Sequence, residues 1–71
     1  MSGLQQRVGL RLRKLRERRG WSQEEFADIC GLHRTYVGSV ERGERNLTLN
    51  SLQTLAKALK VRMADILKGL D

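Results

Sequence analysis

Few residues of this 71-residue chain could take part in metal or nucleophilic chemistry. Cys30 and His33 stand at the spacing of two zinc ligands, but two ligands do not make a zinc site, and the sequence holds no second histidine. Cys30 also continues an apolar helical pattern, which predicts a small core residue rather than a nucleophile. The sequence has neither a glycine-rich phosphate loop nor a nucleophile elbow. We therefore expect no enzyme, no catalytic residue, no metal and no cofactor.

A second kind of chemistry, hydrogen bonding to the bases of a nucleic acid, is available between residues 34 and 39. The planar guanidinium of Arg34 matches the O6 and N7 acceptors of guanine, and Thr35 can offer a hydroxyl to a base or a methyl group to thymine. Ser39, one turn further on, is expected to reach a base, to contact a phosphate or merely to be small. The formal net charge of +6 indicates a polyanion partner, although charge for solubility alone explains it equally well.

Two short helices are predicted to position these side chains. Apolar residues recur at helical spacing, break at Gly31 and resume, at positions 26, 27, 30, 37 and 40. Ser22 followed by Glu25 predicts a capping box at the start of the first helix. Gly31 suits the reversal because only glycine takes a positive φ without a steric cost. Residues 22–43 are thus predicted to form a helix-turn-helix motif, whose second helix can enter a DNA major groove.

Three further helices are predicted around this motif. The first should run from about Leu4 to Arg19, the fourth from a Thr48 cap to about Leu59, and the fifth from about Met63 to Lys68. Their apolar stripes are expected to face one core, made by Leu4, Val8, Leu12 and Leu15 of the first helix and Leu49, Leu52, Leu55, Ala56 and Leu59 of the fourth. Because proline and an alternating strand pattern are both missing, residues 1–71 are predicted to be a single all-α domain of five short helices.

The motif resembles the phage-repressor type of helix-turn-helix domain, the Cro/cI or XRE family. The resemblance is carried by Ser22-Gln23, Ala27, Gly31, Val37, Val40 and Glu41-Arg42-Gly43, and it continues to about Leu67. Within the family, the stretch HRTYVGSVERGERNLTLNSL is similar to the small controller proteins of restriction–modification systems. The resemblance implies a lambda-repressor-like fold and a sequence-specific transcriptional regulator. Such a regulator would act as a homodimer on inverted-repeat operators in double-stranded DNA.

The resemblance also implies roles for individual residues. Base contacts fall on Arg34, Thr35 and Ser39, and DNA backbone contacts fall on Gln23, Tyr36, Arg42, Arg45 and Asn46. The dimer interface falls on Met63, Ile66, Leu67 and Leu70, with Leu49 or Asn50 at its margin. Arg16 and Glu41 are implied to form a structural ion pair. The alternatives stay open: solvated charges for the backbone contacts, packing on the domain for Tyr36, and a completed monomer core for the interface residues.

Two other classes of function remain compatible with the sequence. An antitoxin-like interaction protein would use the same domain to mask a partner. A general nucleic-acid-binding domain would use the basic first helix through Arg11, Arg13 and Lys14. A membrane-surface role for that helix is disfavoured because its stripe is needed for the core and anchoring aromatics are missing. No apolar run approaches the ~20 residues of a membrane span, and no signal-peptide pattern is seen. We expect a cytoplasmic protein with no membrane partner and no small-molecule ligand.

Overall fold

A computed structural model describes residues 3–70, which form five helices. The helices are α1 (Gly3–Arg18), α2 (Gln23–Cys30), α3 (Arg34–Glu41), α4 (Leu49–Leu59) and α5 (Met63–Leu67), with no strand in the described range. The predicted all-α, five-helix architecture is confirmed. Its boundaries are correct to one residue, since α1 ends at Arg18 and α5 at Leu67. The single predicted domain also included residues 1, 2 and 71, which lie outside the described residues.

Interactions between neighbouring residues define both ends of α2, the first helix of the helix-turn-helix motif. The Ser22 hydroxyl accepts a hydrogen bond from the Glu25 amide at 3.0 Å, and the Glu25 carboxylate accepts one from the Ser22 amide at 2.8 Å. This capping box satisfies amide groups that the first turn of α2 would otherwise leave unpaired. At the other end of α2, Gly31 has a φ of +71°, the left-handed conformation that allows the chain to turn sharply into α3.

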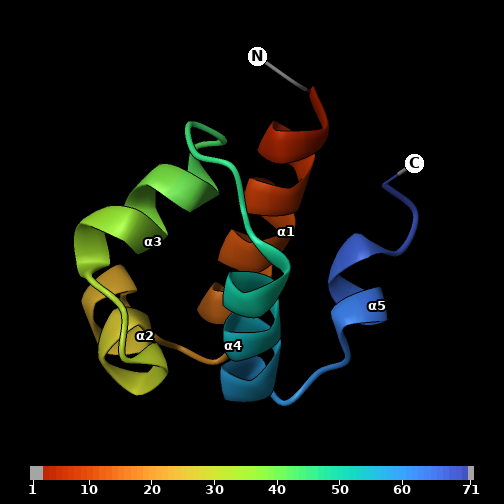
Figure 1. Cartoon of the computed structure of the whole chain (residues 1–71). Helices are drawn as coiled ribbons and strands as arrows, with labels where there is room; N and C mark the ends of the chain where they lie inside the picture. Colours follow the sequence, from red (N-terminus) through yellow and green to blue (C-terminus); the bar gives the residue numbers. More distant parts are fainter. Residues whose placement is uncertain (1–2, 71) are drawn as a thin grey trace.

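Figure 1 shows how the five helices surround one core. Helices α2 and α3 lie on one side of the view, α5 on the other, with α1 and α4 between them. Close contacts join α3 to α1 and α2, and join α5 to α1 and α4. The largest fully buried side chains come from four helices: Leu12, Phe26, Leu55, Leu59 and Ile66. Helix α3 adds Val37 and Val40, so its opposite face is left open.

Helix α1 crosses α3 closely at Gly9. A Cβ atom at this position would lie 2.4 Å from the Glu41 carbonyl oxygen and 2.5 Å from that of Val40, well inside van der Waals contact. Only glycine therefore lets α1 rest against the last turn of α3. Sequence patterning did not single out Gly9, because the requirement comes from an element more than thirty residues away along the chain.

Several apolar residues are less buried than predicted, among them Leu15, which is half-buried. Leu49 was predicted on the inner face of α4 but is 75% exposed, because it occupies the first helical position, before α4 meets the core at Leu52. Leu4 lies near the start of α1 and is 46% exposed. Cys30, expected in the core, is half-buried at the end of α2. No helix in the described range is both long and apolar enough to span a bilayer.

Candidate nucleic-acid interface

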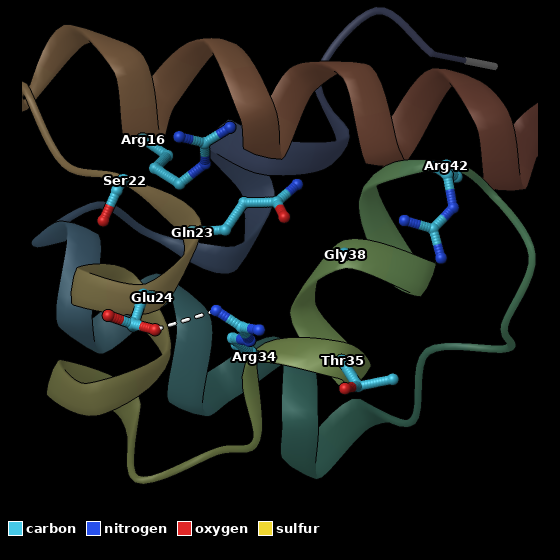
Figure 2. A pocket seen from close by; sticks show the side chains of 8 residues that line it. All are labelled: Arg16, Ser22, Gln23, Glu24, Arg34, Thr35, Gly38 and Arg42. Carbon is cyan, nitrogen blue, oxygen red and sulfur yellow. Dashed lines mark hydrogen bonds and ion pairs between the residues drawn. The ribbon is translucent and has the colours of Figure 1, made fainter.

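A groove lies between the start of α2 and the outer face of α3. Its lining, drawn in Figure 2, consists of Arg16, Ser22, Gln23, Glu24, Arg34, Thr35, Gly38 and Arg42. The groove thus brings together residues predicted for base contact and residues predicted for backbone contact. Three arginines among them make the lining predominantly basic.

The outer face of α3 begins with two exposed polar side chains. Arg34 and Thr35 are exposed, whereas Val37 and Val40 on the opposite face are buried. His33 fixes the start of the helix, because its Nδ1 accepts a hydrogen bond from the Thr35 amide at 3.1 Å. Sequence analysis did not assign this capping role to His33. The cap thus defines where α3 begins, and the side chains of Arg34 and Thr35 are exposed at this end of the helix.

Arg34 has a partner within the groove. Its Nη1 lies 2.9 Å from the Glu24 Oε2, and both side chains are about two-thirds exposed, at 68% and 66%. Figure 2 shows the two side chains pointing toward one another from α3 and α2. The sequence prediction gave Glu24 no role, since nothing in its local pattern shows that a residue ten positions later lies beside it.

Gln23 is connected to the core through Glu41. Its Nε2 donates a hydrogen bond to the Glu41 Oε1 at 3.0 Å. The same carboxylate accepts two hydrogen bonds from the Arg16 guanidinium, from Nε at 2.7 Å and from Nη2 at 3.0 Å. Arg16 also donates from Nη1 to the Trp21 carbonyl at 2.8 Å. The hydrogen bond to Glu41 raises the pKa of Arg16 above its ordinary value. The ion pair that the resemblance implied is present and orients the Gln23 amide at the groove.

The side chains of Ser39 and Tyr36 are engaged within the subunit. The Ser39 hydroxyl donates to the Tyr36 carbonyl at 2.8 Å, so it is directed along its own helix rather than outward. The Tyr36 ring is half-buried, and the Arg45 guanidinium lies 5.4 Å from its centroid, within cation–π range. Packing on the domain, the alternative for Tyr36, is therefore realised in this structure.

The remaining predicted backbone contacts follow α3 on its C-terminal side. Arg42 is exposed, and its Nε lies 3.1 Å from the Glu44 Oε2. The Asn46 Oδ1 accepts a hydrogen bond from the side-chain Nε2 of Gln5. Gly38 lies in the groove between Arg42 and Gln23. A Cβ atom at this position would lie 3.1 Å from the Arg42 Nη1 and 3.3 Å from the Gln23 Oε1. The neighbours of Gly38 are thus ends of side chains in the groove, not the backbone of a packed helix.

The residues predicted for a dimer interface divide into two groups. Ile66 is fully buried and Leu70 is 8% exposed within the subunit, so the prediction that they offer contact surface is corrected: both complete the monomer core. Leu67 is 42% exposed and Met63 half-buried. Leu67 borders two adjoining grooves that Leu4 also lines, and Leu49 lines the first of them.

Helix α5 is fastened to α1 by Arg11. The Arg11 guanidinium donates to the Asp65 carbonyl at 3.0 Å and to the Lys68 carbonyl at 3.0 Å. These carbonyls belong to the C-terminal end of α5, where a cation is favoured by the helix dipole. Arg11 is therefore engaged in the fold, although sequence analysis grouped it with the exposed basic residues of the first helix.

Metal chemistry finds no support in the arrangement of side chains. No group of three or more histidine, cysteine or acidic residues in the described range is placed to hold a metal ion. Cys30 and His33 therefore lack further ligands among residues 3–70. Burial raises the pKa of the Cys30 thiol to about 11, which keeps it protonated and unreactive near neutral pH.

Comparison with known proteins agrees with this geometry. Residues 12–66 match the family model described as helix-turn-helix. The control protein C.SmaI of Serratia marcescens is 54% identical over 56 residues, covering 79% of this chain and 67% of its own length. The crystal structure of the restriction–modification controller protein C.AhdI from Aeromonas hydrophila superimposes with a TM-score of 0.84 at 46% identity, covering 86% of this chain and 92% of that one.

A third similar protein has been solved with DNA. The restriction–modification controller C.Esp1396I, as a tetramer in complex with its natural 35-base-pair operator, has a TM-score of 0.88 and 36% identity, covering 99% of this chain and 92% of that one. The chain therefore belongs to the helix-turn-helix family of DNA-binding transcription regulators, within which it resembles the controller proteins of restriction–modification systems.

Proposed function

We propose that this protein is a restriction–modification controller that binds inverted-repeat operators as a cytoplasmic homodimer. The observation that carries the proposal is the open start of α3, where Arg34 and Thr35 are exposed beside a basic groove while the opposite face is buried. A recognition helix works in this way, by presenting its N-terminal side chains to base edges in the major groove. The family to which the chain belongs is one of DNA-binding transcription regulators rather than of enzymes.

Base recognition is assigned to Arg34 and Thr35. Both precede the first buried residue of α3 and need no rearrangement of the core to reach a DNA duplex. Ser39 contributes to base contact only if its hydroxyl leaves the Tyr36 carbonyl, so we rank it behind the other two.

Phosphate contacts are assigned to the two sides of the groove. Gln23 stands at the first position of α2, where backbone amides and the helix dipole favour an anion. Its Nε2 carries two hydrogens, and one of them stays available when the other is donated to Glu41. Arg42, Arg45 and Asn46 would contact the backbone on the far side of α3. Tyr36, whose ring packs on the domain, would do so only through its hydroxyl group. Such contacts position the protein without reading sequence.

The dimer is assigned to the apolar face made by Leu4, Leu49 and Leu67. All three are exposed, and they line neighbouring grooves at the ends of α1, α4 and α5. Met63 is expected at the edge of this face. A two-fold dimer carries two α3 helices, and helix-turn-helix dimers bind half-sites about 34 Å apart, one turn of DNA.

The sequence-specific role is tested by selection from a random DNA pool, using the wild type, Arg34→Ala and Arg13→Ala. Arg13 is the matched control, because it is an exposed arginine paired with a carboxylate, Glu17, at 3.3 Å. The wild type and Arg13→Ala should enrich one inverted repeat, and Arg34→Ala should relax a guanine in each half-site. Failure of the wild type to enrich any sequence would reject the proposed function.

The dimer is tested by sedimentation equilibrium of Leu67→Lys against Ile29→Lys. Ile29 is 51% exposed on α2, outside the apolar face, so it controls for adding a charge at an exposed apolar position. Leu67→Lys should be a folded monomer at concentrations where Ile29→Lys is dimeric. If the two variants associated equally, Leu67 would not lie in the dimer interface.

General nucleic-acid binding through α1 is less well supported, because Arg11 is held by the carbonyls of α5. It predicts that Arg34→Ala binds DNA as tightly as the wild type. Co-purification of a second protein chain would instead favour the antitoxin-like role.

A further inference from the structure

We propose that Glu24 is a positioning residue for Arg34 that sets the sequence specificity of the protein by restricting how this arginine can bind DNA. The inference rests on the proposed function, because it concerns the base contact assigned to Arg34. It adds to that function a residue on the other helix of the motif, one that makes no base contact of its own.

The starting observation is that an acidic residue lies in the basic groove that is proposed to contact DNA. Among the described residues lining the groove, Glu24 is the one acid, beside Arg16, Arg34 and Arg42. Its carboxylate is exposed, and any DNA phosphate entering the groove would be repelled by it. An acid in the first turn of α2 is favoured by the helix dipole, and the exposed ion pair adds little to folding. Glu25 already places an acid in that turn, so the dipole alone does not explain a second carboxylate that faces the groove.

The geometry of the ion pair suggests that reason. Glu24 Oε2 accepts from the Arg34 Nη1 at 2.9 Å, as Figure 2 shows, which leaves the Nε and Nη2 donors of the guanidinium without an assigned partner. These two donors form one edge of a planar fork, the arrangement that meets the O6 and N7 acceptors of guanine together. Glu24 therefore holds the guanidinium by one nitrogen and leaves a bidentate edge for a base.

The same contact restrains Arg34 from binding elsewhere. A long arginine at the start of an exposed helix can swing to the nearest phosphate, which gives affinity without sequence preference. With Glu24 beside it, Arg34 loses one donor and its charge is partly balanced. Binding to unrelated DNA is weakened, while the guanine contact, which uses the free edge, is kept. The carboxylate thus lowers nonspecific affinity more than specific affinity, which is how an unfavourable element produces specificity.

The experiment compares Glu24→Gln with Glu17→Gln. Glu17 is the matched control because it is 52% exposed, pairs with Arg13 at 3.3 Å and lies outside the groove, so both variants remove one carboxylate from an exposed pair. Dissociation constants are measured for three duplexes over a range of salt: the selected operator, the same operator with the Arg34-dependent guanines replaced, and an unrelated sequence. Thermal unfolding should show that both variants are folded, with only a small decrease for Glu24→Gln, whose carboxylate lies in the first turn of α2.

For Glu24→Gln we expect tighter binding to the unrelated duplex, with the salt slope steeper by about 0.9, equivalent to one added phosphate contact. The ratio of unrelated to operator dissociation constants should fall about fivefold or more, within the discrimination of a bidentate arginine–guanine contact. Glu17→Gln should shift all three constants by a similar factor and keep the ratio. Repeating Glu24→Gln in the Arg34→Ala background should leave the ratio unchanged, because Glu24 acts through Arg34.

Two failures can be told apart. If the wild type discriminates the operator and Glu24→Gln keeps or raises the ratio found for Glu17→Gln, the role of Glu24 is rejected while the regulator stands. If the wild type itself shows no preference among the three duplexes, the proposed function fails and the inference fails with it.

Discussion

The Arg16 guanidinium donates two hydrogen bonds to the Glu41 carboxylate, from Nε at 2.7 Å and from Nη2 at 3.0 Å, and both side chains are almost fully buried. The pair joins α1 to the last residue of α3, and the same carboxylate accepts from Gln23 at the groove. One buried interaction therefore connects the packing of the domain to its proposed DNA-binding surface.

Removing one partner of this pair should destabilise the fold. Arg16→Met leaves the Glu41 carboxylate buried without its cation, at a cost of about 3–5 kcal/mol, whereas Arg16→Met with Glu41→Leu removes both charges and should recover most of it. Denaturant unfolding measures both. Because the pKa of Arg16 is raised, the contribution of the pair is present below the ordinary guanidinium pKa and is lost only as pH rises through the raised one. The contribution of the pair to the unfolding free energy should thus be constant across neutral pH. If the double variant were as unstable as Arg16→Met alone, the prediction about the buried charge would be wrong.

Substitution by alanine should affect stability at one glycine, Gly9, and DNA binding at another, Gly38. Gly9→Ala places a methyl group against backbone carbonyls that cannot yield, so we expect a loss of about 1–3 kcal/mol in unfolding free energy despite the better helix propensity. Gly38→Ala meets only the ends of Arg42 and Gln23. Its stability should change by no more than about 1 kcal/mol, while operator affinity falls because both neighbours line the groove. Comparable unfolding curves for the two variants would show that the α1–α3 crossing adapts.

Arg11 should matter for stability more than other basic residues of α1. Arg11→Met keeps the aliphatic stem but removes hydrogen bonds from a charged donor to the α5 carbonyls, at an expected cost of about 1.5–3 kcal/mol. Arg13→Met is the control, since Arg13 pairs only with exposed Glu17 and should change stability by less than about 0.5 kcal/mol. Both are compared by denaturant unfolding and by sedimentation. Dimerisation of Arg11→Met should weaken as well, because α5 carries Leu67.

The reactivity of Cys30 should follow a raised pKa. Burial raises the pKa of this thiol to about 11, so the folded protein keeps its proton where the unfolded chain has lost it. The stability linked to this proton is present below the ordinary thiol pKa and is lost as pH rises through about 11. Alkylation of the folded protein should be slow near neutral pH and accelerate toward that value. The same chain in denaturant is the control, since it has a single cysteine; identical pH profiles would contradict the prediction.

The parts of the fold that sequence could predict are those specified by neighbouring residues. The capping box of Ser22 and Glu25, the turn at Gly31 and the inward Val37 and Val40 each depend on contacts within about one helical turn. That is why the helix-turn-helix motif and its outward residue Arg34 were located correctly. Most other helix ends follow the same local rules, but the C-cap of α4 is Lys60 in the left-handed conformation, a position at which these rules favour glycine.

The features that sequence could not predict depend on how helices meet. Gly9 is required by the carbonyls of α3, and Arg11 by those of α5, each far away along the chain. Ile66 has the same apolar character as Leu67, yet one is buried and the other exposed, because only the packing of α5 decides which side of a short helix faces inward. The ion pair between Glu24 and Arg34 likewise depends on α2 and α3 lying side by side.

The exposed start of α3 bears on how such regulators diverge. Arg34 and Thr35 are exposed, so under the proposed function the operator sequence can be rewritten at these positions with little change in thermal stability. Gln23 lacks this freedom, because its amide is tied to a carboxylate that the fold requires. Operators recognised by descendants of this chain should therefore vary first at the bases facing Arg34 and Thr35, and the spacing of phosphate contacts should persist longest.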